Sequence, residues 1–229
     1  MTSHRKPSKT ASEYSHEWDA VWDRGGSLNF IVSVGRSVYN YFFFRMLTPF
    51  IKAKGAANIT LLEIGCGTAT LGLSVCKHFL KLKRYTGVDI SESALALANK
   101  NAKESGVKNY SFLKGDCFAL PAPDESFDIA WSQGLIEHLH APGKAVMEHH
   151  RVIKHGGRAF VIVPAKFSYH YLWWSLTRVP FLRKLWPWTD QIFYTRGMLG
   201  ELIAGKNIKY RTYFVFPCIL GLLALELRK

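Results

Sequence analysis

A chain of 229 residues, of which 48% are apolar and 21% are charged, is long enough for one domain with a substantial core and too apolar for a disordered protein. Its formal net charge of +13 is uneven, because residues 1–150 carry 17 Lys and Arg against 14 Asp and Glu, whereas residues 151–229 carry 13 against 3. We therefore expect any anionic partner to bind the last third, although a solvated basic surface accounts for the same charge.

The cysteines and the N-terminus indicate the compartment. Cys66, Cys76, Cys117 and Cys218 show no C-x-x-C spacing, which favours reduced thiols and a cytoplasmic protein. The first ten residues are polar and basic without an apolar run, so a signal peptide is not expected.

The first 56 residues are predicted to lie outside the main domain. We expect a disordered tail over residues 1–12 and N-terminal cap helices over residues 13–56, one at Glu13–Gly26 and one at about Leu28–Lys54. The second stretch is rich in aromatic residues, but two arginines and a proline interrupt it. It therefore lacks the continuous apolar run of a membrane span.

Residues 57–229 are predicted to form the main domain, with an insertion at about 165–195. Short strand-like runs alternate with helical stretches, which predicts an α/β fold with a mostly parallel sheet and helices on both faces. The expected strands make a seven-stranded sheet: Ile59–Ile64, Tyr85–Val88, Tyr110–Leu113, Phe127–Trp131, Arg158–Val163, Ile208–Phe216 and Ile219–Leu227. The helices expected between them are Thr68–Leu80, Glu92–Ser105 and Ala141–Lys154.

The stretch Leu61–Thr70 (LLEIGCGTAT) is typical of a buried strand that ends in a tight turn before a helix. Gly65 and Gly67 permit positive φ and a close approach of a ligand to the backbone, although such glycines also serve to shape a turn alone. Polar side chains follow the neighbouring strands: Asp89, Asp116 and the pair Ser132-Gln133.

Ligands of open parallel sheets bind at this edge, where the strands end. A carboxylate such as Asp89 suits the two hydroxyls of a ribose, and Asp116 suits an exocyclic adenine amine. The dinucleotide fingerprint G-x-G-x-x-G fails at Thr70, and Glu63 places negative charge where a pyrophosphate would lie. The same charge suits a cationic ligand, such as the amino group of S-adenosylmethionine.

Five ordered motifs over about residues 57–165 resemble the class I S-adenosylmethionine-dependent methyltransferases, in their small-molecule, type-11 branch. They are LEIGCGTA at 62–69, GVDIS at 87–91, GDC at 115–117, FDIA followed by SQGLIEHL at 127–139, and RVIKHGG at 151–157. Ala69 stands where many members have a third glycine, and we expect its methyl group to be tolerated. His155 stands where this branch usually has proline.

The resemblance implies a Rossmann-like methyltransferase fold, with S-adenosylmethionine as methyl donor and S-adenosylhomocysteine as product. It implies that the methionine end of the cofactor is bound by Glu63, Gly65, Cys66, Gly67, Ser132 and Gln133. It implies that the nucleoside is bound by Asp89, Ile90, Asp116 and Cys117.

The donor is already activated, so proximity and orientation are the main catalytic requirements. An oxygen or nitrogen acceptor that must lose a proton also needs a general base, and His138 follows the fourth strand at the active edge. A histidine that packs at the start of a helix explains the same residue equally well. No Cys or carboxylate joins the histidines at ligand spacing, so no metal is expected.

The segment Phe167–Tyr194 contains ten aromatic residues in 28, with arginine and lysine between them. Such a lid suits a large apolar or aromatic acceptor, and it also suits contact with an anionic membrane from which a lipid-like substrate is collected. A packed insertion without any role in binding remains an alternative. The side chains that we expect in the acceptor pocket are Tyr14, Trp18, Trp22, Tyr169, Trp173, Trp174 and Tyr194.

Methyl transfer to a small, apolar, aromatic or lipid-like acceptor is the function that the sequence favours. The basic last third leaves open an RNA methyltransferase, although no RNA-binding module and no N-P-P-Y/F motif is present in the sequence. A membrane-associated protein that binds the cofactor without turnover is also left open. The sequence does not identify the acceptor.

Overall fold

The structure, a computed structural model, describes residues 8–23, 29–79, 81–176, 191–215 and 221–229. For residues 29–39, 169, 170 and 173 it describes the backbone alone. Much of the predicted insertion, residues 177–190, therefore lies outside the described residues.

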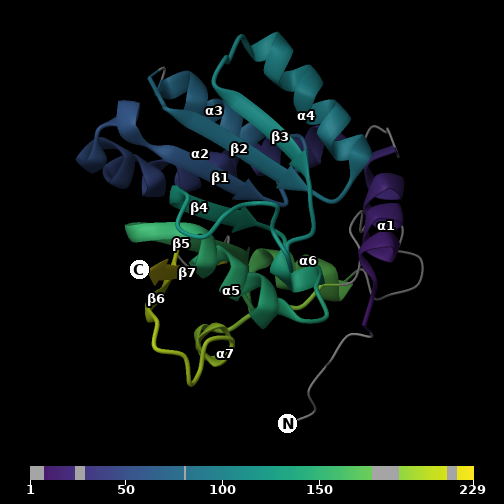
Figure 1. Cartoon of the computed structure of the whole chain (residues 1–229). Helices are drawn as coiled ribbons and strands as arrows, with labels where there is room; N and C mark the ends of the chain where they lie inside the picture. Colours follow the sequence, from purple (N-terminus) through teal and green to yellow (C-terminus); the bar gives the residue numbers. More distant parts are fainter. Residues whose placement is uncertain (1–7, 24–28, 80, 177–190, 216–220) are drawn as a thin grey trace.

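A seven-stranded sheet runs through the centre of the molecule (Figure 1). The strand order is β3-β2-β1-β4-β5-β7-β6, which places β1 in the interior of the sheet. The order in which the chain adds strands reverses between β1 and β4, which are themselves parallel neighbours. The strands are β1 (Thr60–Ile64), β2 (Arg84–Asp89), β3 (Tyr110–Lys114), β4 (Phe127–Gln133), β5 (Ile153–Pro164), β6 (Lys209–Phe214) and β7 (Leu222–Arg228). The mostly parallel, seven-stranded sheet predicted from the sequence is confirmed.

The last two strands complete the sheet in the antiparallel sense. β7 pairs with β5 from Arg158↔Arg228 to Pro164↔Leu222, and β6 pairs with the other side of β7. Residues 222–227 are all buried, which suits a strand with a neighbour on each side and helices above and below.

Helices cover both faces of the sheet (Figure 1). They are α1 (Ala11–Asp23), α2 (Asn29–Lys54), α3 (Thr70–His78), α4 (Glu92–Ser105), α5 (Pro142–Val152), α6 (Tyr169–Leu176) and α7 (Arg196–Glu201), with 3-10 turns η1 (Ala56–Asn58) and η2 (Ile136–His138). The side chains of α2, α3 and α4 pack in one core on one face. The side chains of α5, η2 and α7 pack in a second core on the other face.

Several predicted boundaries differ from the structure, and three of the differences have a clear local cause. β4 continues to Gln133, because Ser132 and Gln133 pair with Val161 and Ile162 of β5. β5 begins at Ile153 rather than at the predicted Arg158, and it includes Gly156-Gly157, where the register shifts and Gly156 takes a φ of +72°. α1 begins at Ala11, within the predicted tail, because the side chain of Glu13 accepts hydrogen bonds from the backbone N and the hydroxyl of Thr10.

Within the described part of the chain, no helix is long and apolar enough to cross a membrane.

Candidate active site

The turn between β1 and α3 has the geometry that its glycines predict. Gly65 and Gly67 take φ of +68° and +51°. The backbone N–H groups of Gly65 and Cys66 both donate to the carbonyl of Val88, at 2.8 and 3.1 Å, which fixes the turn against the end of β2. A Cβ on Gly65 would lie 3.0 Å from the side chain of Leu135. The turn thus needs glycine both for its conformation and for its close packing.

Ala69 occupies the position where many members of the resembled family have a third glycine. It takes a left-handed conformation with φ of +56° and forms the N-cap of α3, with its methyl group fully buried. The left-handed region costs a non-glycine residue about 1–2 kcal/mol. The turn therefore keeps the glycine-like backbone although the residue is alanine.

Asp89 is held at the end of β2 by backbone groups on both of its carboxylate oxygens. Its Oδ2 accepts from Gly67 N at 2.7 Å, and its Oδ1 accepts from Ser91 N at 3.0 Å. Burial raises the pKa of Asp89, and the backbone hydrogen bonds counteract part of that rise. A carboxylate has about four acceptor positions, and the backbone groups leave part of that capacity for a donor such as a ribose hydroxyl.

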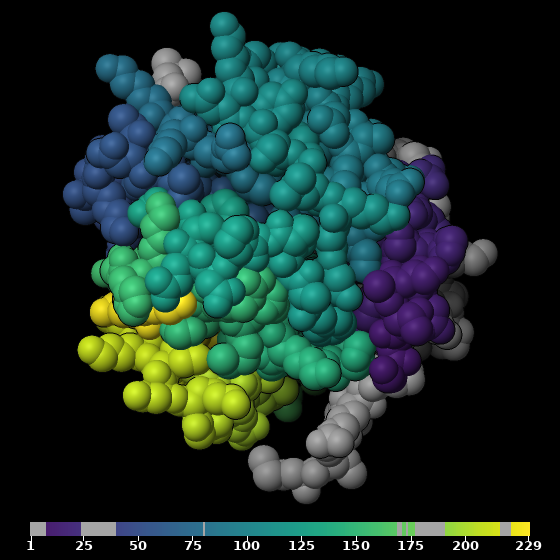
Figure 2. All heavy atoms as spheres, in the orientation of Figure 1, coloured from purple at the N-terminus to yellow at the C-terminus, as the bar shows by residue number. Residues whose placement is uncertain are grey.

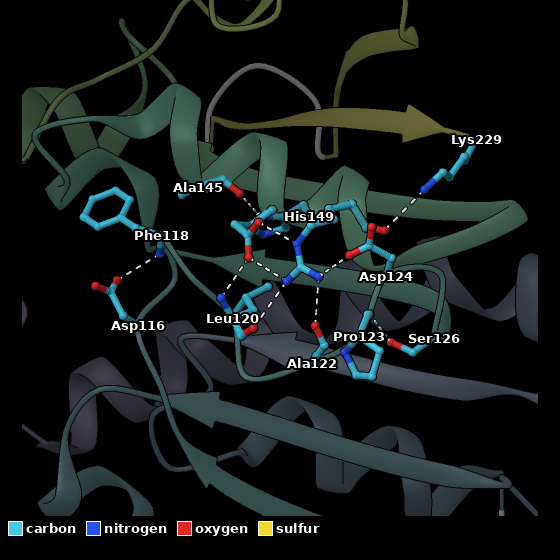
Figure 3. Close-up of polar contacts among 12 residues, drawn as sticks. Asp116, Phe118, Leu120, Ala122, Pro123, Asp124, Ser126, Ala145, His149 and Lys229 are labelled. Atoms are coloured by element: carbon cyan, nitrogen blue, oxygen red, sulfur yellow. Dashed lines mark hydrogen bonds and ion pairs between the residues drawn. The ribbon is translucent and has the colours of Figure 1, made fainter.

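The loop after β3 and the helix α1 enclose a hollow beside Asp89. The cavity of about 450 Å³ is lined on one side by α1, including Ser15 and Asp19, and on the other by Ile90 and Asp116. Asp116 is half-buried, and its Oδ1 accepts from Phe118 N at 2.9 Å, as Figure 3 shows. Of the predicted nucleoside residues, Ile90 and Asp116 line this hollow with α1 as an additional wall, and Asp89 directly precedes Ile90 in the chain.

Arg151 on α5 fixes the chain between β3 and β4 through Leu120, Ala122 and Asp124, which are labelled in Figure 3. Arg151 binds both carboxylate oxygens of Glu148, at 2.7 and 2.8 Å, and also contacts Asp124 at 2.6 Å. It donates further to the carbonyls of Ala122 and Leu120. In the sequence Arg151 stands out only as part of the motif RVIKHGG, and in the structure it holds the segment that follows Asp116.

Glu63 lies on the face of the sheet covered by α2 and α3. It is 5% exposed, and its Oε2 accepts a hydrogen bond from the hydroxyl of Tyr85 on β2. The ring of Tyr85 passes over Gly72 of α3, where a Cβ would lie 2.2 Å from the ring. Glu63 is thus held by Tyr85, a residue that the sequence did not single out. A contact with the methionine amino group stays a prediction.

Ser132 does not offer its hydroxyl to the predicted cofactor site. The residue is fully buried, and its Oγ lies 2.9 Å from Nε2 of His149 on α5. Nδ1 of His149 lies 2.7 Å from the carbonyl of Ala145, which accepts only, so Nδ1 carries the proton and Nε2 accepts from Ser132. Only the backbone of Ser132 remains for a ligand. The neighbouring Gln133 is half-buried and stays a candidate.

The predicted base His138 lies in η2, directly after β4. It is 8% exposed, and the ring of Trp18 on α1 meets it edge-on with ring centroids 5.1 Å apart. Tyr14 lies one turn before Trp18 on α1. Its hydroxyl lies 3.1 Å from Nδ1 of His140 and accepts a hydrogen bond from the backbone N of His140. α1 therefore covers the segment that holds the predicted base.

The chain that returns from the insertion reaches the same segment. Tyr194 is 2% exposed and its hydroxyl donates to the carbonyl of Ile136, while Ile192 N donates to the carbonyl of Glu137. The predicted residues Tyr14, Trp18, His138 and Tyr194 thus gather around η2.

The other predicted pocket residues lie farther along the lid or are not described in full. Trp174 on α6 packs on Phe193 with ring centroids 5.2 Å apart. Trp22 is half-buried near the end of α1, and Tyr169 and Trp173 belong to α6, where only their backbone is described. Cys66 is buried and Cys117 half-buried, and burial raises the pKa of both thiols. Among the residues that the structure describes, no three His, Cys, Asp or Glu side chains form a metal-binding group.

These features define a class of protein. The sheet order, a glycine turn after the central strand β1 and carboxylates after β2 and β3 are those of a class I methyltransferase fold. The glycine turn and the remaining acceptor capacity of Asp89 fit a nucleoside without phosphates, as in S-adenosylmethionine.

The comparisons agree with this class. Residues 62–161 match the family model described as "Methyltransferase domain" in its type-11 form, so this part of the chain is similar to that family. The uncharacterized methyltransferase YcgJ of Bacillus subtilis is 33% identical over 110 residues, covering 48% of this chain and 42% of that protein. Demethylmenaquinone methyltransferase of Porphyromonas gingivalis is 27% identical over 119 residues, covering 52% of this chain and 46% of that protein.

The chain thus spans less than half the length of these curated relatives. Among solved structures, magnesium protoporphyrin IX methyltransferase of Synechocystis, with bound S-adenosylhomocysteine, matches with a TM-score of 0.66 and 16% identity over 96% of each chain. This likeness confirms the Rossmann-like fold.

Proposed function

We propose that this protein transfers a methyl group from S-adenosylmethionine to a small apolar or aromatic acceptor of quinone-like or lipid-like character. The observation that carries the proposal is the convergence of aromatic side chains from α1 and from the returning chain on η2, next to the glycine turn. Trp18 and Tyr194 lie there beside His138. The demethylmenaquinone methyltransferase among the relatives supports the same acceptor class.

The residues have separate roles in this proposal. Gly65 and Gly67 admit the methionine portion of the cofactor, and Asp89 accepts from the ribose hydroxyls. The bound sulfonium supplies an activated methyl group. His138 accepts the proton of an acceptor hydroxyl, and the aromatic wall of Trp18 and Tyr194 excludes water from it.

The exposed side of α6 supports collection of the acceptor from an anionic membrane. Phe167, Leu172 and Leu176 are 78%, 60% and 47% exposed. Nζ of Lys166 lies 5.4 Å from the ring centroid of Phe167. Exposed apolar side chains beside a cation, in the part of the chain that carries the excess positive charge, are typical of a surface that binds anionic lipid.

The backbone of Phe167 adds to this interpretation. Its φ of +66° lies in the left-handed region, which costs a bulky residue about 1–3 kcal/mol. This strained backbone holds a large apolar side chain in an exposed position, where its ring contacts that of Tyr171 with ring centroids 5.7 Å apart.

The acceptor is tested by incubating the protein with methyl-labelled S-adenosylmethionine and fractionated cell extract. Label in the lipid or small-molecule pool is expected, and label in RNA alone would contradict the proposal. The His138→Ala variant should then lose most turnover while it still binds S-adenosylhomocysteine. Unchanged turnover would show that His138 is not the base.

Membrane binding is tested by sedimentation with vesicles of phosphatidylcholine and phosphatidylglycerol. The protein should sediment at low salt and less at high salt, because salt screens the lysine and arginine charges. Phe167→Ser should weaken sedimentation. The matched control Tyr210→Ser, which removes an exposed aromatic residue on β6, should not. No sedimentation of the unchanged protein at low salt would remove the membrane proposal.

A further inference from the structure

Helix α1 is attached to the loop that carries Asp89 rather than to the sheet alone. Asp19 on α1 accepts from the hydroxyl of Ser91 at 2.6 Å and from Ser93 N at 3.2 Å, both through Oδ1. One turn earlier, the hydroxyl of Ser15 donates to the carbonyl of Ile90 at 3.1 Å. Three hydrogen bonds therefore join α1 to residues 90–93. Figure 2 shows α1, in purple, lying along one edge of the molecule.

The same loop orients Asp89. Ser91 N donates to Asp89 Oδ1, and Gly67 N donates to Asp89 Oδ2. Ser91 therefore links the two carboxylates, because its hydroxyl donates to Asp19 and its backbone N donates to Asp89, which in turn accepts from the glycine turn. Ser91 is also the N-cap of α4, since its Oγ accepts from Ala94 N at 3.0 Å. Its hydroxyl proton is therefore directed toward Asp19, and loss of Asp19 would leave that hydroxyl free to rotate.

The position of the cavity gives this link through Ser91 a consequence for ligand binding. Ser15 and Asp19 line the hollow of about 450 Å³ from one side, while Ile90 and Asp116 line it from the other. A nucleoside between Ile90 and Asp116 would therefore lie against α1. An ordered α1 favours the bound position of Asp89, and a bound nucleoside favours the docked position of α1.

We propose that Asp19 is a positioning residue for the cofactor: through Ser91 it fixes Asp89, so that docking of α1 and binding of the nucleoside are coupled. The proposal rests on the use of S-adenosylmethionine but not on the identity of the acceptor. It gives α1 a role in donor binding, in addition to the acceptor contacts assigned to Trp18.

The test is calorimetric titration with S-adenosylhomocysteine. Asp19→Ala removes a charge-assisted hydrogen bond and should weaken binding roughly tenfold. Asp19→Asn keeps an oxygen that accepts from Ser91 and should restore most of the affinity. Asp23→Ala removes an exposed carboxylate at the end of the same helix and serves as the matched control. It should bind like the unchanged protein.

Two further measurements separate positioning from a general loss of structure. In a Ser91→Ala background, Asp19→Ala should weaken binding by no more than about threefold, because the hydrogen bond between the Ser91 hydroxyl and Asp19 is already absent. In the unchanged protein, S-adenosylhomocysteine should slow hydrogen exchange of the amides in Ala11–Asp23, a result that does not depend on any variant folding.

Failure of the unchanged protein to bind S-adenosylhomocysteine would overturn the proposed function together with this inference. If the unchanged protein binds S-adenosylhomocysteine, two results would each overturn the inference alone. One is an affinity of Asp19→Ala within twofold of that of the unchanged protein, and the other is no slowing of hydrogen exchange in α1.

Discussion

His149 gives the protein a stability that depends on pH in a calculable way. Its burial lowers the pKa of His149 from 6.5 to about 4, because the charged ring would lose its solvation. The folded chain therefore keeps the ring neutral over a range in which the unfolded chain takes up a proton. Stability from this residue is complete above pH 6.5 and is lost as the pH falls toward 4.

The magnitude follows from these two pKa values. At pH 5 the unfolded chain is almost fully protonated at this position, whereas about a tenth of the folded chain is. The linkage relation then predicts a loss of about 2 kcal/mol of unfolding free energy between pH 7.5 and pH 5 from His149 alone. Other titrating groups, including His150, add their own terms to the total.

A variant isolates the contribution of His149. His149→Gln retains a group that can accept from Ser132 and donate to Ala145, but it does not titrate. We expect it to be about 1–2 kcal/mol less stable at pH 7.5, from poorer packing and geometry. On acidification to pH 5 it should lose about 2 kcal/mol less than the unchanged protein, so the two stabilities converge.

The assay is urea unfolding at a series of pH values, followed by tryptophan fluorescence. His155→Gln, which removes a histidine whose side chain is 81% exposed and lies 3.2 Å from Oε1 of the exposed Glu125, is the control for loss of a histidine as such. Its pH dependence should follow that of the unchanged protein. The reasoning would be refuted by a His149→Gln variant that loses as much stability as the unchanged protein between pH 7.5 and pH 5.

Further predictions concern the turn, the chain after β3 and the acid limit of stability. Gly67→Ala should destabilise by about 1–2 kcal/mol in urea unfolding, because alanine resists a φ of +51°; an unchanged midpoint would contradict this. Arg151→Ala should cost about 2–3 kcal/mol by the same measurement, and Arg151→Lys should recover only part, because lysine cannot replace the paired contacts to Glu148. Equal stability of the two variants would argue against those contacts. Burial opposes ionisation of Asp128, but hydrogen bonds from Lys154 and Thr60 lower its pKa to about 2. The ionised carboxylate should therefore contribute about 1 kcal/mol of unfolding free energy above pH 4, a value reduced for the partial exposure of the lysine. This contribution should be lost as the pH falls toward 2. An Asp128→Asn variant that loses as much stability over that range would refute the assignment.

The sequence predicted those parts of the site that depend on local pattern. A glycine turn must follow a strand, and carboxylates placed after successive parallel strands must lie at one edge of the sheet. The positive φ of Gly65 and Gly67 and the positions of Asp89 and Asp116 at the strand ends were predicted in this way. Each of these positions can be inferred from a few neighbouring residues.

The contacts that the sequence did not reveal join residues far apart in the chain. Ser132 was expected at the ligand, but its partner His149 lies on a later helix. The hold of Tyr85 on Glu63 depends on the absence of a side chain at Gly72. The attachment of α1 depends on Asp19, which looks like any solvated carboxylate in an amphipathic helix. Such pairings are decided by packing, and no local pattern records them.

The strained backbone of Phe167 has a consequence for protein engineering. Glycine at this position would relieve a left-handed conformation and remove an aromatic ring from water, so a screen for heat resistance would select it. If α6 meets a lipid surface as proposed, the same replacement would also remove a side chain that partitions into lipid. A substitution at Phe167 would then raise thermostability and at the same time reduce access to the substrate.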